Sequence, residues 1–402
     1  MSVSLCPERE CTGCGACLNR CPKNAIRMET DEEGFVHPVV NADLCIGCGL
    51  CRKACPVITP VGLNMPPECA YAAWAKDEAI RSSSSSGGLF SVLAEYVLSH
   101  GGVVNGVSFE KGMELRHRVV SSVQGLKAVR GSRYVQADVG LIYRHLESAL
   151  KSGQLVLFTS TPCQVAGFKA YLGRDYDNLI TCDLICHGVP SASFFRDCLA
   201  DQFGLNVCEV KDFRFRDLLH WGYSSVAFDT SGESKEIAFK SDYYSMSFLR
   251  AFSSRENCYE CAYAQMQRVG DFTLGDFWGL PLGFRLRHDT RKGCSLVLLN
   301  TDKARRIYEQ LEARIFSDKR AIAECRENHQ LFRPVRRSAC RDVFYRMWRE
   351  LPAEQFAVKC RAWLRLTPVV WMCSLIPRCI RKGKSMVEQW FWTLKDRRRV
   401  RQ

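Results

Sequence analysis

The chain has 402 residues, 47% of them hydrophobic, so it is long enough for two or three domains with sizeable cores. Many of its 23 cysteines recur at short spacings without an N-terminal signal segment. We therefore expect a reducing, cytoplasmic setting and not a disulfide scaffold. The longest apolar run, Val369–Ile376, is much shorter than a membrane-spanning helix, which predicts that no segment crosses a bilayer.

Residues 11–56 contain the cysteine pattern C-x2-C-x2-C-x3-C-P twice. Three closely spaced thiolates can bind three corners of a 4Fe-4S cluster, and in two-cluster ferredoxins the fourth cysteine of each run reaches the other cluster. The pattern therefore predicts two 4Fe-4S clusters with crossed ligands. One set is Cys11, Cys14, Cys17 and Cys55, and the other is Cys45, Cys48, Cys51 and Cys21.

A structural zinc site is the alternative, because paired C-x2-C motifs also bind zinc through four thiolates. The triple run with a following proline, present twice, favours iron-sulfur clusters and a role in electron transfer. We expect residues 1–65 to form this ferredoxin domain, with Pro56–Pro67 as a linker. Cys6 and the other cysteines without paired spacing are expected to be plain thiols.

A mixed α/β region follows the linker. A short strand at Tyr71–Ala75 precedes the polar loop Ser82–Gly88, which leads into an apolar-periodic helix at Leu89–Ser99. Backbone amides at a helix N-terminus suit a pyrophosphate, although serine runs are also ordinary N-caps and flexible loops.

Two later strands end at residues with reactive side chains. The strand Gln154–Ser160 ends before Cys163, which is a candidate cluster ligand, a redox thiol or a small buried residue. The strand Asn178–Cys186 ends before His187, a candidate proton donor whose alternative role is to order its loop. Asp276 and Trp278 are further candidates, either for the lining of a pocket or for the cap of a turn.

From residue 66 to about residue 315 the chain resembles the beta-subunit family of coenzyme F(420) hydrogenases and dehydrogenases, a deazaflavin-linked flavoprotein family. The resemblance rests on six motifs in order: Ser84–Leu89, Gly131–Asp138, Thr161–Gly167, Asp183–Ser191, Cys258–Cys261 and Gly270–Gly279. The N-terminal double ferredoxin is similar to that of bacterial members encoded among polysaccharide-synthesis genes. The resemblance implies an N-terminal family region at 66–150 and a C-terminal one at 151–315. Ser160 and Arg133 depart from the usual Gly and Lys.

The resemblance also implies two kinds of cofactor. FAD is expected to contact Ser85, Ser86, Gly87, Gly88, Arg133, Tyr134 and Gln136. A third 4Fe-4S cluster near the flavin is expected to be held by Cys163, Cys186, Cys258 and Cys261, with Cys182 as the alternative for Cys186. These expectations describe an oxidoreductase that moves electrons between clusters, FAD and an organic substrate, deazaflavin or ferredoxin partner. The alternative is a relay subunit of a larger redox or polysaccharide-synthesis assembly, without its own substrate.

The formal net charge of +13 is concentrated at the C-terminal end. Residues 314–402 hold 22 Lys and Arg against 8 Asp and Glu, and we expect residues 316–402 to form a basic helical tail. Basic residues interleaved with tryptophans in Trp363–Trp392 suit an interfacial helix at the inner membrane face. A solvated helical face or a docking surface for an acidic partner is the alternative, and no motif supports nucleic-acid binding.

Overall fold

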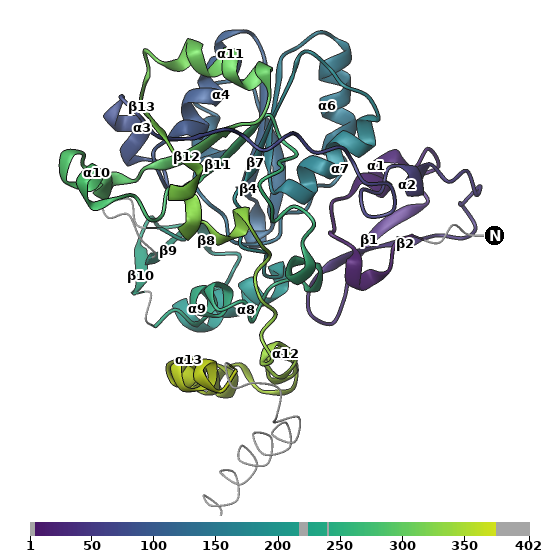
Figure 1. Ribbon diagram of the computed structural model, residues 1–402. Coiled ribbons are helices and arrows are strands. Elements are labelled where there is room, and N and C mark those ends of the chain that lie inside the picture. Colours follow the sequence, from purple (N-terminus) through teal and green to yellow (C-terminus); the bar gives the residue numbers. More distant parts are fainter. Residues whose placement is uncertain (1–4, 217–223, 239–240, 375–402) are drawn as a thin grey trace, which may run out of the picture. The chain divides into compact units, whose positions relative to one another are not determined.

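The computed structural model describes residues 5–216, 224–238 and 241–374 (Figure 1). It divides into two compact units, Met1–Ala353 and Glu354–Gln402. Each unit is described by itself below.

The N-terminal part of the first unit is a small ferredoxin module. Its antiparallel hairpin joins β1 (Ile26–Thr30) to β2 (Val36–Val40). Helices α1 (Ala16–Arg20) and α2 (Leu50–Lys53) each begin after a glycine in the left-handed region, where φ is 71° at Gly15 and 72° at Gly49. A side chain is strained at such a φ, so glycine permits the tight turn between the second and third cysteines of each run.

The rest of the first unit is built on an eight-stranded mixed sheet with the order β13-β3-β12-β11-β7-β6-β4-β5. Its strands are β3 (Ala70–Ala75), β4 (Val103–Phe109), β5 (Leu115–Val120), β6 (Val156–Ser160), β7 (Leu179–Leu184), β11 (Phe272–Asp276), β12 (Ser295–Leu299) and β13 (Ile315–Arg320). The four central strands β4, β6, β7 and β11 are parallel. Their carboxyl ends therefore meet at one edge of the sheet, where ligands bind in open α/β sheets.

Helices cover both faces of this sheet (Figure 1). On one face, α4 (Leu89–Ser99) and α11 (Asp302–Leu311) pack against Leu157 and Ile180. On the other face, α6 (Ile142–Lys151) and α7 (Pro162–Leu172) pack against Val156, Phe158 and Leu179. Successive residues of β6 and β7 therefore point to opposite faces of the sheet, and both faces are covered by helices.

The ferredoxin module shares a hydrophobic core with α6 and α7. Cys14 and Ala16 belong to the same buried cluster as Phe168 of α7 and Tyr143 of α6. Figure 1 shows the module beside α7, at one side of the sheet, and α1 of the module contacts this helix. The mixed α/β fold with a small two-cluster module, predicted from the sequence, is thereby confirmed.

The first unit also contains a smaller sheet and further short helices. A three-stranded antiparallel sheet has the order β10-β9-β8. Its strands and the other helices are β8 (Val210–Arg214), β9 (Ser224–Asp229), β10 (Ser234–Ala238), α3 (Glu78–Ser82), α5 (Leu126–Val129), α8 (Ala192–Phe203), α9 (Tyr243–Leu249), α10 (Leu282–Arg287) and α12 (Arg341–Glu350). Short 3-10 helices lie at η1 (Glu8–Glu10), η2 (Lys111–Met113), η3 (Glu256–Glu260), η4 (Thr290–Lys292), η5 (Ile322–Glu327) and η6 (His329–Leu331).

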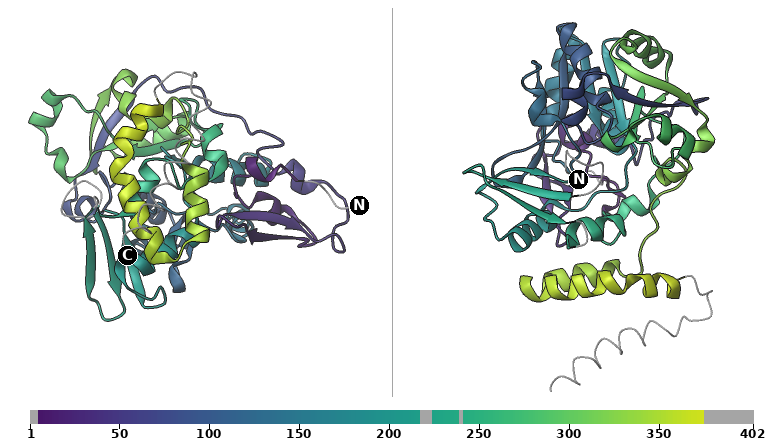
Figure 2. Two further views of the ribbon diagram at one scale, coloured as in Figure 1. Left: turned by 90° about the horizontal axis from the view of Figure 1, so that it is seen from below. Right: turned by 90° about the vertical axis from the view of Figure 1, so that its left-hand side faces the viewer.

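The first unit continues to Ala353 through β13 and α12, whereas the sequence predicts a tail from residue 316. Helix α13 (Ala353–Ser374) is one continuous helix in Figure 2. Its apolar residues Phe356, Cys360 and Trp363 follow the helical period. In the part of the chain that the structure describes, no helix has the length and apolar character needed to span a bilayer. The rest of the predicted tail, 375–402, lies outside the described residues.

Candidate functional site

The eight cysteines of the doubled motif line two separate cavities. The first, the proximal cysteine site, is lined by Cys11, Cys14, Cys17 and Cys55. The second, the distal cysteine site, is lined by Cys21, Cys45, Cys48 and Cys51. The structure thus places the fourth cysteine of each run with the first three of the other run. Backbone amides of Gly13 and Ala25 donate to the Sγ atoms of Cys11 and Cys21 at 3.4 and 3.2 Å. Four thiols with such N–H···S contacts fit a 4Fe-4S cluster at each site.

The two sites differ in their access to solvent. Cys11, Cys14 and Cys55 of the proximal site are buried, whereas Cys48 of the distal site is exposed. Two exposed apolar side chains, Leu44 and Ile46, flank the distal site and are 51% and 60% exposed. The distal site is therefore the one that a partner molecule can reach directly.

The proximal site lies against the N-terminal half of α7. A Cβ atom added to Gly167 would lie 2.8 Å from the Sγ of Cys14, so only glycine allows this approach. The hydroxyl of Tyr143 lies 2.8 Å from the carbonyl oxygen of Cys14 and 2.9 Å from that of Gln164. Because Gln164 follows Cys163 directly, these contacts join the proximal site to the first turn of α7.

Cys163 and Cys186 line the cavity at the carboxyl edge of the sheet, and Cys258 and Cys261 neighbour them to complete a third group of cysteines. Burial raises the pKa of all four thiols, and the neighbouring thiolates raise it further for Cys163, Cys186 and Cys258. For Cys186 and Cys258 the pKa rises to about 12. Cys182 is also buried, but its surroundings are Thr159, Asp183 and Asp271. The structure therefore places Cys186, and not Cys182, with the other three. Four mutually close thiols fit a third 4Fe-4S cluster.

A buried ion pair orders the chain around this third group. The side chains of Arg268 and Asp183 are 1% and 0% exposed, and Nη2 of Arg268 lies 2.7 Å from Oδ1 of Asp183. Backbone amides of Val269 and Gly270 donate to the other carboxylate oxygen at 3.1 and 2.8 Å. Arg268 also donates to the carbonyl oxygen of Tyr263 at 2.8 Å. The segment after Cys261 is thereby held to the end of β7.

A cavity of ≈ 310 Å³ opens at the same edge and is lined by loops that are far apart in the sequence. Its lining includes the predicted flavin contacts Ser85, Ser86, Gly88, Arg133, Tyr134 and Gln136, together with Cys163, Cys186, His187, Asp276 and Trp278. Gly87 packs instead against the sheet, where a Cβ atom would lie 2.3 Å from the carbonyl oxygen of Ala73. One cavity thus contains the predicted flavin loops and two of the predicted third-cluster ligands.

Buried donors lie in the part of the cavity next to α4. Among the described residues, the Nε atoms of Arg130 and Arg133 and the hydroxyl of Ser86 have no hydrogen-bond partner. The Arg133 side chain is 7% exposed, and burial lowers the pKa of its guanidinium. The first turn of α4 begins at Gly88 and has no side-chain cap. Buried donors of this kind are rare, and beside a helix N-terminus they fit an anionic group such as the pyrophosphate of FAD.

Arg216 connects these loops to the end of β11. Its Nη2 lies 2.5 Å from Oδ2 of Asp276, and the two side chains are 3% and 12% exposed. It also donates to the hydroxyl of Tyr134 at 2.8 Å and to the carbonyl oxygen of Ser85 at 3.2 Å. Sequence reasoning missed Arg216 because no motif surrounds it. Asp276 and Trp278 line the cavity, which favours the pocket interpretation of both residues.

His187 lines the cavity with both ring nitrogens engaged. Nε2 lies 3.3 Å from the carbonyl oxygen of Leu249, and Nδ1 lies 2.7 Å from Nε2 of Gln330. A carbonyl oxygen only accepts, so Nε2 carries the proton and Nδ1 accepts from the amide. Burial lowers the pKa of His187 and favours the neutral ring. These contacts favour the loop-ordering role, and proton donation by His187 stays a prediction.

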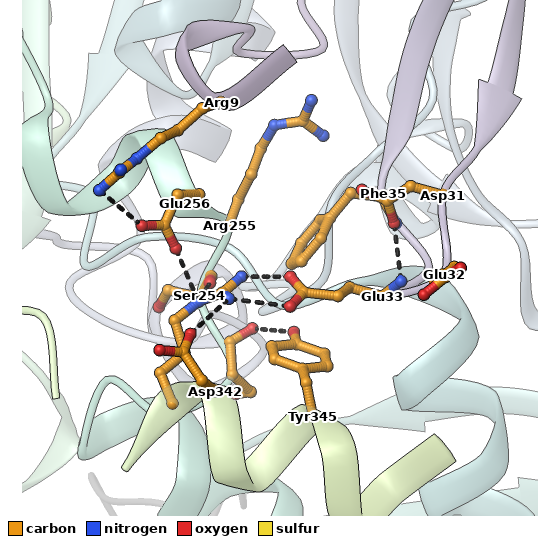
Figure 3. Close-up of polar contacts among 12 residues, drawn as sticks. Arg9, Asp31, Glu32, Glu33, Phe35, Ser254, Arg255, Glu256, Asp342 and Tyr345 are labelled. Atoms are coloured by element: carbon orange, nitrogen blue, oxygen red, sulfur yellow. Dashed lines mark hydrogen bonds and ion pairs between the residues drawn. The ribbon is translucent and has the colours of Figure 1, made fainter. Parts of the chain in front are cut away.

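Two buried arginines join the ferredoxin module to the rest of the first unit. Arg255 donates to the carbonyl oxygens of Cys11 at 2.7 Å and Val36 at 3.0 Å. Arg341 of α12 binds both carboxylate oxygens of Glu33 at 3.0 and 2.5 Å (Figure 3). These contacts and the shared core hold the module in one position. The sequence around Arg255 and Arg341 contains no motif that predicts these contacts.

Three protein-family models match parts of the chain. Two models of the coenzyme F(420) hydrogenase/dehydrogenase beta subunit match the chain, the N-terminal one at residues 70–142 and the C-terminal one at 153–324. A 4Fe-4S dicluster domain model matches residues 10–58. Among solved structures, the chain is similar to a chain of the F(420)-reducing NiFe hydrogenase complex from Methanosarcina barkeri. The sequence identity is 17% and the TM-score 0.45, over 67% of this chain and 90% of that chain. The comparison with curated protein sequences found no match.

Proposed function

The chain belongs to the coenzyme F(420) hydrogenase/dehydrogenase beta-subunit family, and from that premise we propose that it is an iron-sulfur flavoprotein oxidoreductase. Its dicluster domain makes it an iron-sulfur electron-transfer protein of this family. The observation that supports the finer proposal is the shared cavity, which brings the predicted flavin loops together with Cys163 and Cys186. FAD bound there would exchange electron pairs with an organic substrate or deazaflavin and single electrons with clusters.

The flavin would be held chiefly by its pyrophosphate. The N-terminus of α4, Ser86, Arg130 and Arg133 offer the unpartnered donors for this group. Arg216 is itself occupied by Asp276, and it fixes the relative position of the Ser85 and Tyr134 loops. The walls of the cavity are thus preorganised before a ligand enters.

The cysteine sites follow one another in a spatial order that suits electron transfer. The proximal site and the third group both adjoin α7, because Gly167 of this helix faces Cys14 and Cys163 lies in its first turn. The order is therefore distal site, proximal site, third group and cavity. An electron that enters at the exposed distal site has a neighbouring site at each stage toward the cavity.

A relay subunit without its own substrate is the second candidate function. The exposed distal site favours it, because Leu44 and Ile46 offer an apolar contact there and Lys23, Arg52 and Lys53 are exposed on the same module. Such a surface suits a redox partner protein with acidic side chains at its docking face. The two candidates differ in whether the cavity retains flavin.

The test is the content of iron, acid-labile sulfide and flavin in anaerobically purified protein. We expect about twelve irons and one FAD per chain, the sum of three four-iron clusters and one flavin. Cys258→Ser should lose about four irons, and Cys182→Ala, the matched control, should lose none. About eight irons without flavin would replace the oxidoreductase proposal with the relay. Full flavin reduction by a reduced ferredoxin in Cys258→Ser would contradict the proposed order of sites.

A further inference from the structure

The proximal cysteine site contains a fifth cysteine. Cys6 lines the same cavity as Cys11, Cys14, Cys17 and Cys55, and its thiol neighbours the thiols of Cys11 and Cys55. Among the described residues, the distal cavity is lined by four cysteines and no fifth. Cys6 precedes η1 and lies outside the doubled motif, so the repeat does not account for it.

A four-iron cluster at the proximal site does not need Cys6 as a ligand. Such a cluster has four iron corners, and the proximal motif cysteines already supply four thiolates. A thiol that binds no iron keeps its proton and can donate one weak hydrogen bond. Here the acceptors within reach are the sulfur atoms of two cluster ligands.

A hydrogen bond to a ligand sulfur stabilises the reduced cluster more than the oxidised one, because the reduced cluster carries one more negative charge. We propose that Cys6 is a non-ligating thiol of the proximal site, which donates to the sulfur of Cys11 or Cys55 and raises the reduction potential of the proximal cluster. The inference rests on the dicluster module alone and is independent of the flavin and of the third cluster.

The Cys6 thiol would make the proximal site differ from the distal site, although the same cysteine motif forms both sites. The proximal site also lies next to the buried guanidinium of Arg255, whose Nε is 2.7 Å from the carbonyl oxygen of Cys11. Both groups stabilise added negative charge at the proximal site. An electron shared between the two clusters of the module would therefore favour the proximal one, which is nearer to the cavity.

The experiment compares Cys6→Ala, Cys6→Ser and wild type as full-length, anaerobically purified proteins. Cys208→Ala is the control, because Cys208 is an exposed thiol that lines neither cysteine site. Iron and sulfide contents are measured first, and redox titrations followed by electron paramagnetic resonance then give the midpoint potential of each cluster. The distal signal is assigned with Cys48→Ser, which changes the exposed distal ligand.

We expect Cys6→Ala to retain its iron. The equilibrium constant for reduction of its proximal cluster should fall at least tenfold, which corresponds to a midpoint potential about 59 mV more negative for one electron. Cys6→Ser keeps an O–H donor and should shift less, and Cys208→Ala should match wild type. A loss of about four irons in Cys6→Ala would make Cys6 a ligand and overturn the proposal. Unchanged potentials at full iron content would overturn it as well, and so would a shift confined to the distal cluster.

Discussion

Single buried residues set the chemistry of the cavity. Arg133 is almost fully buried, and its Nε has no partner in the part of the chain that the structure describes. An anionic ligand would remove the cost of this unsatisfied donor. Lys is usual at this position in the family, and a lysine supplies charge without the planar fork of a guanidinium. The residue therefore offers a direct test of the proposed pyrophosphate site.

We expect Arg133→Ala to weaken FAD binding by about 10- to 100-fold, because a charge-assisted hydrogen bond contributes about 1.5 to 3 kcal/mol. Arg133→Lys should fall between the alanine variant and wild type. The measurement is a fluorescence titration of flavin-depleted protein with FAD. Arg174→Ala is the control, because Arg174 is exposed and does not line the cavity. Equal FAD affinity in all four proteins would refute the assignment.

His117 predicts how stability depends on pH. This side chain is 9% exposed, and burial lowers its pKa from 6.5 to about 4. The pKa of this ring is lower in the folded state than in the unfolded state, so the unfolded chain binds a proton first as the pH falls. The unfolding free energy is therefore highest above pH 6.5 and decreases as the pH falls toward 4. The difference of about 2.5 pKa units corresponds to about 3 kcal/mol. Between pH 7 and pH 4.5, the unfolding free energy should therefore decrease less in His117→Gln than in wild type. Parallel pH profiles in urea unfolding would contradict this prediction.

At the scale of elements, α7 connects two cysteine groups. Its first turn carries Cys163, and its Gly167 faces Cys14 of the proximal site. A helix is stiff over this length, so a change at the Gly167 contact is transmitted to both groups. The close approach also explains why a glycine with low helix propensity occurs inside this helix.

Gly167→Ala should displace Cys14 and lower the unfolding free energy by about 1 to 3 kcal/mol, the usual cost of overpacking. It should also reduce the iron content associated with the proximal site. Gly283→Ala in α10 is the matched control, because a Cβ atom there meets nothing within 4 Å. Thermal unfolding and iron analysis of both variants measure the effect. A Gly167→Ala protein as stable and as rich in iron as the Gly283→Ala protein would show that the contact is not tight.

At the scale of the whole molecule, the ferredoxin module is held in place and is not a mobile carrier. Glu33 of the module binds Arg341, and the two side chains are 26% and 3% exposed (Figure 3). Its neighbour Glu32 binds Arg349, and these side chains are 84% and 38% exposed. Breaking the Arg341–Glu33 pair removes two charge-assisted hydrogen bonds from a buried guanidinium, which keeps Glu256 Oε2 at 3.3 Å, while an exposed pair contributes little.

Glu33→Gln should therefore lower the unfolding free energy by about 1.5 to 3 kcal/mol and increase hydrogen exchange in the β1–β2 hairpin. Glu32→Gln, the control, should change both by little. Urea unfolding and exchange followed by mass spectrometry measure the two effects. Equal behaviour of the two variants would mean that the Arg341 contact does not hold the module.

The second unit carries a separate prediction about membranes. Residues 375–402 contain nine Lys and Arg against two Asp and Glu, which would attract an anionic bilayer. A chain that ends at Ser374 should sediment less with vesicles rich in phosphatidylserine than the full chain does. Neutral vesicles are the control and should bind both chains weakly. Unchanged sedimentation with anionic vesicles would exclude the basic tail as the membrane contact.

The sequence by itself determined the dicluster module and the α/β class. Cluster ligands two and three residues apart are a local requirement, and the strands of the sheet carry their own apolar pattern. Only the tertiary structure decided that Cys186 and not Cys182 lies with Cys163, and that Cys6 shares the proximal site. The contacts of Arg216, Arg255 and Arg341 also emerged only there. Such contacts join residues that are far apart in the chain, and a buried arginine leaves no periodic pattern in the sequence around it.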